Sequence, residues 1–172
     1  MKGRSSAQTG LSPISKWTAV AKELRNIKIG LIALQETHLS EPLADQVSTL
    51  FNRKLTIFNS PSPMNPTGSA GVAFAVNKEL LNTEDIAFHV IIPGRVILLS
   101  FRWQRNMTIS IMNVYAPNDL TKHPDFWSEL ENRWTDLRLP NPDLMVGDFN
   151  MTEDTIDRAP ARPDNENAVL AL

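Results

Sequence analysis

Cysteine is absent from this sequence, so neither a disulfide bond nor a thiolate metal site is available to it. Long apolar runs are also absent, because none approaches the roughly 20 residues that a membrane-spanning helix needs. The polar segment Met1–Gly10 lacks the apolar core of a secretory signal. We therefore expect a soluble intracellular protein without a membrane partner, and the nucleus is one candidate compartment.

The sequence has little excess charge of either sign. Its net charge is −2 at pH 7, so the whole molecule lacks the basic field that draws proteins to DNA non-specifically. A nucleic-acid partner would need a local basic patch or a bridging metal ion. Glycine is scarce, with 7 residues against 12 prolines, and the 172 residues suffice for one domain with a hydrophobic core.

Apolar residues recur with helical spacing in some segments of the chain and form short continuous runs in others. Trp17, Val20, Ala21 and Leu24 have helical spacing, and Ser12-Pro13 before them is a typical helix start. Pro93-Gly94 predicts a hairpin turn. The apolar run 29–34 predicts a strand buried on both faces. Strands are expected at 29–34, 55–58, 71–76, 86–92, 96–103, 107–115 and 144–146, and further helices over 40–51, 126–137 and from 168. This mixture predicts a layered α/β or α+β domain.

Three polar clusters directly follow apolar segments, at 35–38, 115–118 and 147–150. Because ligands gather where strands end and loops diverge, we expect the three clusters to converge on one pocket. Each has a plainer interpretation. Glu36 and Asp148 also fit helix caps or solvated loop acids, and Tyr115 also fits a core position at a strand end. Asn118 and Asn150 are common turn formers.

Together, these acid, phenol and amide groups suit the hydrolysis of a phosphate ester. Glu36 is a natural ligand for Mg²⁺, which takes oxygen ligands and needs only one or two carboxylates. Such an ion neutralises charge on a phosphodiester and stabilises the leaving oxygen. Asp148 is placed to orient or deprotonate the attacking water, with Asn150 fixing its position. Tyr115 and Asn118 are expected to donate hydrogen bonds to the phosphate.

The same clusters resemble, in order, the signature motifs of a known superfamily. Leu34–His38, Asn113–Asn118 and Gly147–Asn150 look like successive motifs of the endonuclease/exonuclease/phosphatase superfamily. This superfamily includes DNase I-like nucleases, apurinic/apyrimidinic endonucleases, inositol polyphosphate phosphatases and neutral sphingomyelinases. Gly68–Ala73 resembles the glycine-rich strand between the first two motifs.

Two further segments narrow the resemblance. Asp157-Arg158 and the polar start Lys2–Ser6 are similar to endonuclease domains of fungal non-LTR (LINE-type) retrotransposons. The resemblance implies a four-layered α/β sandwich of the DNase I-like type. It also implies a DNA-nicking endonuclease that uses Mg²⁺, with Mn²⁺ as the alternative ion.

The resemblance assigns a role to each candidate residue. It implies that Glu36 is the metal ligand and that Asn118 binds phosphate. It implies that Tyr115, Asp148 and Asn150 are the catalytic residues.

Two parts of the family pattern have no counterpart in this sequence. The family has an asparagine at the end of a first strand and an aspartate–histidine pair on late strands. The three histidines here are His38, expected near the site, His89 in a predicted strand and His123 before a predicted helix. We therefore expect residues 1–172 to form a single domain that lacks its C-terminal portion and is slightly incomplete at its N-terminus.

Three functional hypotheses follow from these motifs and gaps. The first is an active nicking endonuclease, and the second is a catalytically inactive, truncated retroelement remnant. The third, a phosphatase of phosphorylated lipid or inositol, ranks lower because no cluster of lysines and arginines is evident. The basic residues near the expected site are interpreted as solvated positions: Arg53, Lys54, Arg95, Arg102 and Arg105. The sequence does not determine the oligomeric state.

Overall fold

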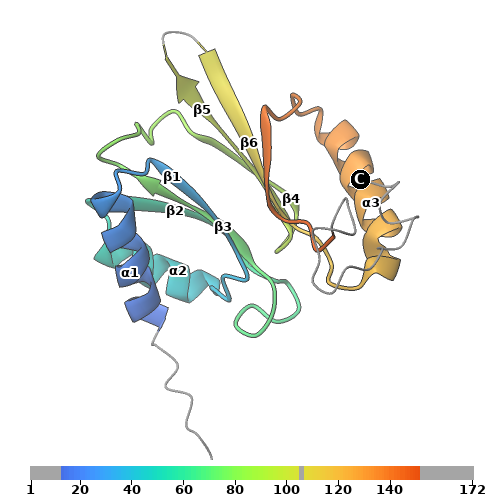
Figure 1. Ribbon diagram of the computed structural model, residues 1–172, viewed down its shortest axis with the longest axis horizontal. Helices are drawn as coiled ribbons and strands as arrows, with labels where there is room; N and C mark the ends of the chain where they lie inside the picture. Colours follow the sequence, from blue (N-terminus) through green and yellow to red (C-terminus); the bar gives the residue numbers. More distant parts are fainter. Residues whose placement is uncertain (1–12, 105–106, 152–172) are drawn as a thin grey trace, which may run out of the picture.

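Two β-sheets face each other in the computed structural model, which describes residues 13–104 and 107–151 (Figure 1). The first sheet is antiparallel with strand order β1-β3-β2, and the second has order β4-β5-β6-β7. Only β6 and β7 among these described strands pair in parallel. The strands are β1 (Leu31–Gln35), β2 (Leu55–Ser60), β3 (Val72–Asn77), β4 (Ala87–Ile92), β5 (Val96–Trp103), β6 (Met107–Tyr115) and β7 (Leu144–Asp148).

Helices cover the outer face of each sheet (Figure 1). Helices α1 (Pro13–Asn26) and α2 (Glu41–Leu50) lie on the first sheet, where Trp17 and Val47 pack in one cluster with Ala75 of β3. Helix α3 (His123–Leu137), preceded by the short 3-10 helix η1 (Leu120–Lys122), lies on the second sheet. The order helix, sheet, sheet, helix confirms the predicted four-layered α/β sandwich.

Alternation along the strands decides which side chains lie between the sheets. In β5, Ile97 and Leu99 pack against Phe74 of β3 in the middle layer. Their neighbour Leu98 points the other way, toward α3. The same alternation in β6 turns Tyr115 into the space between the sheets.

Most predicted elements are present, and the main difference concerns the apolar run 29–34. It was expected to be buried on both faces, yet all five residues of β1 are only partly buried. The reason is that β1 is an edge strand among the described residues, because its one partner there is β3. The polar segment 1–10 and the helix predicted from residue 168 lie outside the described residues. That residues 1–172 form one domain stays a prediction.

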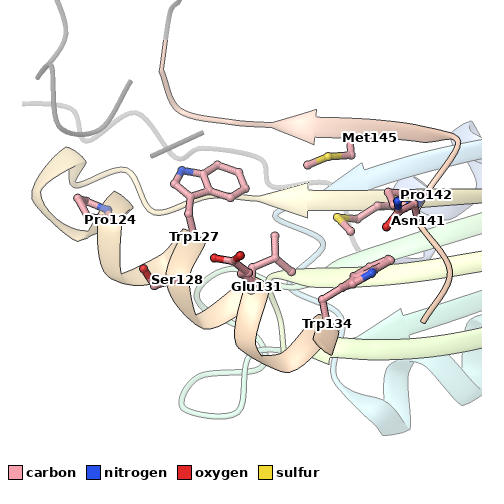
Figure 2. Close-up of a pocket in the computed structure, with 10 residues that line it drawn as sticks. Pro124, Trp127, Ser128, Glu131, Trp134, Asn141, Pro142 and Met145 are labelled. Carbon is pink, nitrogen blue, oxygen red and sulfur yellow. The ribbon is translucent and has the colours of Figure 1, made fainter. Parts of the chain in front are cut away.

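An open groove of about 500 Å³ lies between α3 and β7. Figure 2 shows Trp127 and Trp134 of α3 on one side and Met145 of β7 on the other. Leu144 and Met145 are 49% and 43% exposed, because β7 is the edge strand of its described sheet. This groove is on the α3 side of the second sheet, away from the face that carries Tyr115. No helix in the described part of the chain is long and apolar enough to cross a membrane.

Candidate active site

The three polar clusters meet at one edge of the sandwich because three strands end there. Strand β1 carries Glu36 just beyond its last residue, and β6 ends at Tyr115. Strand β7 runs parallel to β6 with Tyr115 opposite Asp148 in the register. The site is therefore built across the two sheets, with Glu36 from the first and the other clusters from the second.

A continuous chain of contacts links all five candidate residues. The Tyr115 hydroxyl donates a hydrogen bond to Glu36 Oε1 and lies 3.1 Å from Asn118 Oδ1. Asn150 Nδ2 donates to Asn118 Oδ1 at 3.1 Å, and Asn150 N donates to Asp148 Oδ1 at 3.0 Å. The three clusters are therefore in contact, although Asp148 and Asn150 of the third do not line the cavity described below. The roles of the five residues stay predictions.

The backbone at Glu36 has a conformation that side chains rarely adopt. Its φ is 50°, in the left-handed region, which costs a residue other than glycine roughly 1–2 kcal/mol. The next residue is held by a backbone hydrogen bond of 3.1 Å from Thr37 N to Gly71 O. Gly71 itself has a φ of 93°, and a Cβ there would lie 2.7 Å from Thr37 Oγ1. The close approach of these two loops therefore requires a glycine at position 71.

A cavity of about 510 Å³ opens beside this contact chain. Asp148 and Asn150 do not line it and connect to it through Asn118. Hydrogen bonds from Thr121 hold the pKa of the exposed Asp119 carboxyl below its usual range, so the cavity is bordered by a second carboxylate. The lining residues are Glu36, His38, Gly68, Ser69, Ala70, Arg95, Tyr115, Pro117, Asn118, Asp119 and Lys122.

Arg95 belongs to this site, which corrects its interpretation as a solvated position. It is only partly exposed, and its guanidinium lies over the Tyr115 ring, with Cζ 4.6 Å from the ring centroid. Arg95 Nη1 also donates to the carbonyl oxygens of Tyr115 and Ala116 at 3.3 and 3.2 Å. The guanidinium therefore holds both the ring and the backbone at the end of β6.

The histidines occupy three different environments. His38 lines the cavity, as expected, and has a φ of 49°. His123 is fully buried as the first residue of α3, and its Nε2 donates to the carbonyl oxygen of Pro117 at 2.7 Å. His123 thus fixes the loop that carries Asn118 through the backbone of Pro117. His89 lies in β4, away from the cavity.

Tyr115 is held as a neutral hydrogen-bond donor. Burial raises the pKa of its phenol, and the hydrogen bond to Glu36 and the charge of Glu36 raise that pKa further. The positive charge of Arg95 and the contact with Asn118 act in the opposite direction. The net pKa is above the ordinary value, so Tyr115 keeps its proton at neutral pH and can donate it in a hydrogen bond.

The substitution Glu36→Gln should lower the pKa of Tyr115. It removes the negative charge that disfavours the phenolate, whereas the burial remains. Arg95→Met should raise the pKa, because it removes the stabilising positive charge. The sequence contains one tyrosine, so ultraviolet absorption of tyrosinate during an alkaline titration reports this group alone. Equal titration curves for the native chain and both variants would contradict the observed contacts.

The described residues suit Mg²⁺, which keeps several bound waters, better than they suit an ion whose ligands all come from the protein. Residues 13–104 and 107–151 contain no group of three or more histidine, cysteine, aspartate or glutamate side chains placed to hold an ion. Mg²⁺ does not need such a group, because it keeps several waters and binds through one or two carboxylates and substrate phosphates. Glu36 meets this need, since its side chain is exposed to the cavity and only Oε1 contacts Tyr115.

Comparison with known sequences gives one family-level match. The sequence profile of the Endonuclease/Exonuclease/phosphatase family matches residues 17–168, which includes all three polar clusters. A comparison with curated protein sequences gives no significant match.

Solved structures with the same fold include several DNA-processing proteins. An AP endonuclease from Archaeoglobus fulgidus is similar with a TM-score of 0.66 and 20% identity, over 91% of this chain and 63% of its own. The endonuclease domain of TRAS1, a telomere-specific non-LTR retrotransposon, has a TM-score of 0.56 and 16% identity, over 94% and 63%. D. rerio TDP2 complexed with single strand DNA product has a TM-score of 0.56 and 11% identity, over 86% and 58%.

These similarities show that the fold is of the predicted DNase I-like type. The chain spans less than two thirds of each of the three solved chains.

Proposed function

Because this chain belongs to the endonuclease/exonuclease/phosphatase family, we propose that it is a phosphodiesterase that nicks DNA with the help of Mg²⁺. One observation carries the proposal. The five candidate residues form one continuous series of contacts, and three of them, Glu36, Tyr115 and Asn118, line one cavity.

Glu36 and Asn118 each have a side-chain atom that is free for the proposed work. Glu36 Oε2 has no partner among the described residues and is available to hold Mg²⁺ or Mn²⁺. A bound ion of this kind supplies positive charge that offsets the charge of the phosphate. Asn118 uses its Oδ1 within the contact chain, which leaves its Nδ2 to donate to a phosphate oxygen. The single hydrogen of the Tyr115 hydroxyl is donated to Glu36 in this structure, and we propose that it turns to the phosphate once Glu36 holds the ion.

Asp148 is the proposed base for the attacking water. Its Oδ1 accepts a hydrogen bond from Asn150 N, which fixes the carboxylate and leaves Oδ2 to take a proton. The water oxygen then forms the new bond to phosphorus, the ester bond to the leaving oxygen breaks, and that oxygen takes a proton from solvent water. Hydrogen bonds from Tyr115 and Asn118 stabilise the charge that builds on the phosphate.

DNA as the substrate is supported by the nature of the similar solved structures. They include an AP endonuclease, a retrotransposon endonuclease domain and a TDP2 bound to a DNA product. A role in nicking target DNA for a non-LTR retrotransposon is the narrower proposal, supported by TRAS1 and by the resemblance of the sequence. The alternative is a non-catalytic remnant that keeps the fold.

The test is relaxation of supercoiled plasmid by the purified chain. We expect nicked circles to accumulate with Mg²⁺ or Mn²⁺ and to stop accumulating when EDTA is added. Release of inorganic phosphate from inositol phosphates, measured in parallel, should stay at background. Intact plasmid at every protein and metal concentration would instead support the non-catalytic alternative.

A further inference from the structure

Asn113 is a fully buried amide at the junction between the two sheets. It lies in β6 two residues before Tyr115, is 0% exposed, and points to the same side of its sheet. Its Nδ2 donates to the carbonyl oxygens of Leu34 and Ala73, both at 3.1 Å. Its Oδ1 accepts a hydrogen bond of 2.6 Å from Gln35 Nε2. Both amide hydrogens and the amide oxygen are therefore used.

These three contacts tie the first sheet to the second at one point. Leu34 and Ala73 are register partners in β1 and β3, so one side chain of β6 holds both strands. The Gln35 contact is followed directly by the contact between Glu36 and Tyr115. The end of β1 is thus joined to β6 by two successive side-chain pairs.

The backbone of Glu36 needs this support. Its φ of 50° is unfavourable for glutamate, and such conformations persist only where the surroundings over-determine them. The Glu36 side chain is itself exposed, so it gains little from packing. The restraint comes from its neighbours: Gln35 is bonded to Asn113 on one side, and Thr37 is bonded to Gly71 on the other.

We propose that Asn113 and Gln35 are positioning residues that hold Glu36 in place for the metal ion. This inference rests on the proposed function, because it concerns the metal site of that function. A buried amide that only stabilises the fold is the competing explanation. Support by residues behind a metal ligand typically changes metal affinity by about 10- to 100-fold, whereas a purely structural amide leaves it unchanged.

The chain contains a matched control for that competing explanation. Asn77 is a second buried asparagine, 4% exposed, at the opposite end of β3. Its Nδ2 donates to Ile29 O at 3.2 Å, and its Oδ1 accepts from Glu79 N at 3.0 Å. The substitution Asn77→Leu therefore removes a buried amide of the same kind without touching the candidate site.

The experiment measures the dissociation constant for Mn²⁺ by the electron paramagnetic resonance of the free ion. It uses the full chain, Gln35→Met, Asn113→Leu, their double variant, and Asn77→Leu. We expect the constant to rise about 10-fold in each single variant at positions 35 and 113. The double variant should show no rise beyond that of Asn113→Leu, because the contact that Gln35→Met removes is already lost in Asn113→Leu. Asn77→Leu should keep the native constant even where its unfolding midpoint falls.

Gln35→Met decides the case if Asn113→Leu does not fold, because Gln35 is only partly buried and methionine keeps its length. A native Mn²⁺ constant in a folded Gln35→Met variant would overturn the inference and leave the proposed function standing. Failure of the native chain both to bind Mn²⁺ and to nick plasmid would overturn the proposed function and the inference together.

Discussion

Replacing Glu36 with alanine should lower the rate of Mg²⁺-dependent plasmid nicking by about 100-fold or more. A bound metal ion supplies several kcal/mol of charge stabilisation, and each ~1.4 kcal/mol corresponds to a factor of ten in rate. Glu36 is the carboxylate that borders both the cavity and the Tyr115 hydroxyl. Its loss also removes one of the two acceptors of that hydroxyl and leaves Asn118 Oδ1 as the other.

The measurement compares initial nicking rates of the native chain, Glu36→Ala and Glu41→Ala. Glu41 is an exposed acid at the start of α2, outside the cavity, so its variant should nick at the native rate. The fold should survive both changes, and circular dichroism checks this. Equal nicking by the native chain and Glu36→Ala would contradict the proposed role of Glu36 as the metal ligand.

The second large effect should come from Gly147→Ala, which we expect to destabilise the fold by about 3 kcal/mol or more. Gly147 has a φ of 139°, and a Cβ there would lie 1.9 Å from the carbonyl oxygen of Val114. Val114 is the register partner of Gly147 in the parallel pair β6–β7. The clash is with backbone on the neighbouring strand, so no side-chain rotation can relieve it.

Thermal unfolding measures this prediction. For a chain of this size, a loss of about 3 kcal/mol corresponds to a fall in Tm of roughly 6–12 °C. Gly30→Ala is the control, because a Cβ there meets only the flexible Leu81 side chain, at 3.2 Å. Its Tm should stay close to the native value. A native Tm for Gly147→Ala would mean that β7 is not paired with β6 in this register.

The local elements of the fold were predictable because they depend on residues close in sequence. The helical spacing of Trp17 to Leu24 predicted α1, and Pro93-Gly94 predicted the hairpin of β4 and β5. The three clusters were recognisable as a set, because each follows an apolar strand. Their convergence was predictable only from the general rule that such clusters meet at one edge of a layered domain.

The contacts between the sheets were not predictable in the same way. Arg95 enters the site because Val96 pairs with Val114, which places the start of β5 beside the end of β6. Nothing local in the sequence encodes that register. The same holds for Asn113 and Gln35, which are 78 positions apart in the chain and bonded in the fold. The left-handed backbone conformation of Glu36 results from those restraints, and no residue pattern near position 36 predicts it.

The division of the site between the two sheets has a consequence for the newly made protein. Residues 31–77 form the first sheet and carry Glu36, while Tyr115 and Asp148 arrive on the last two described strands of the second. Chains emerge from the ribosome in that order, and early segments begin to fold first. A half-translated chain therefore holds the proposed metal ligand without the groups that would attack DNA. The proposed nuclease activity therefore requires that β7, the last described strand, has paired with β6.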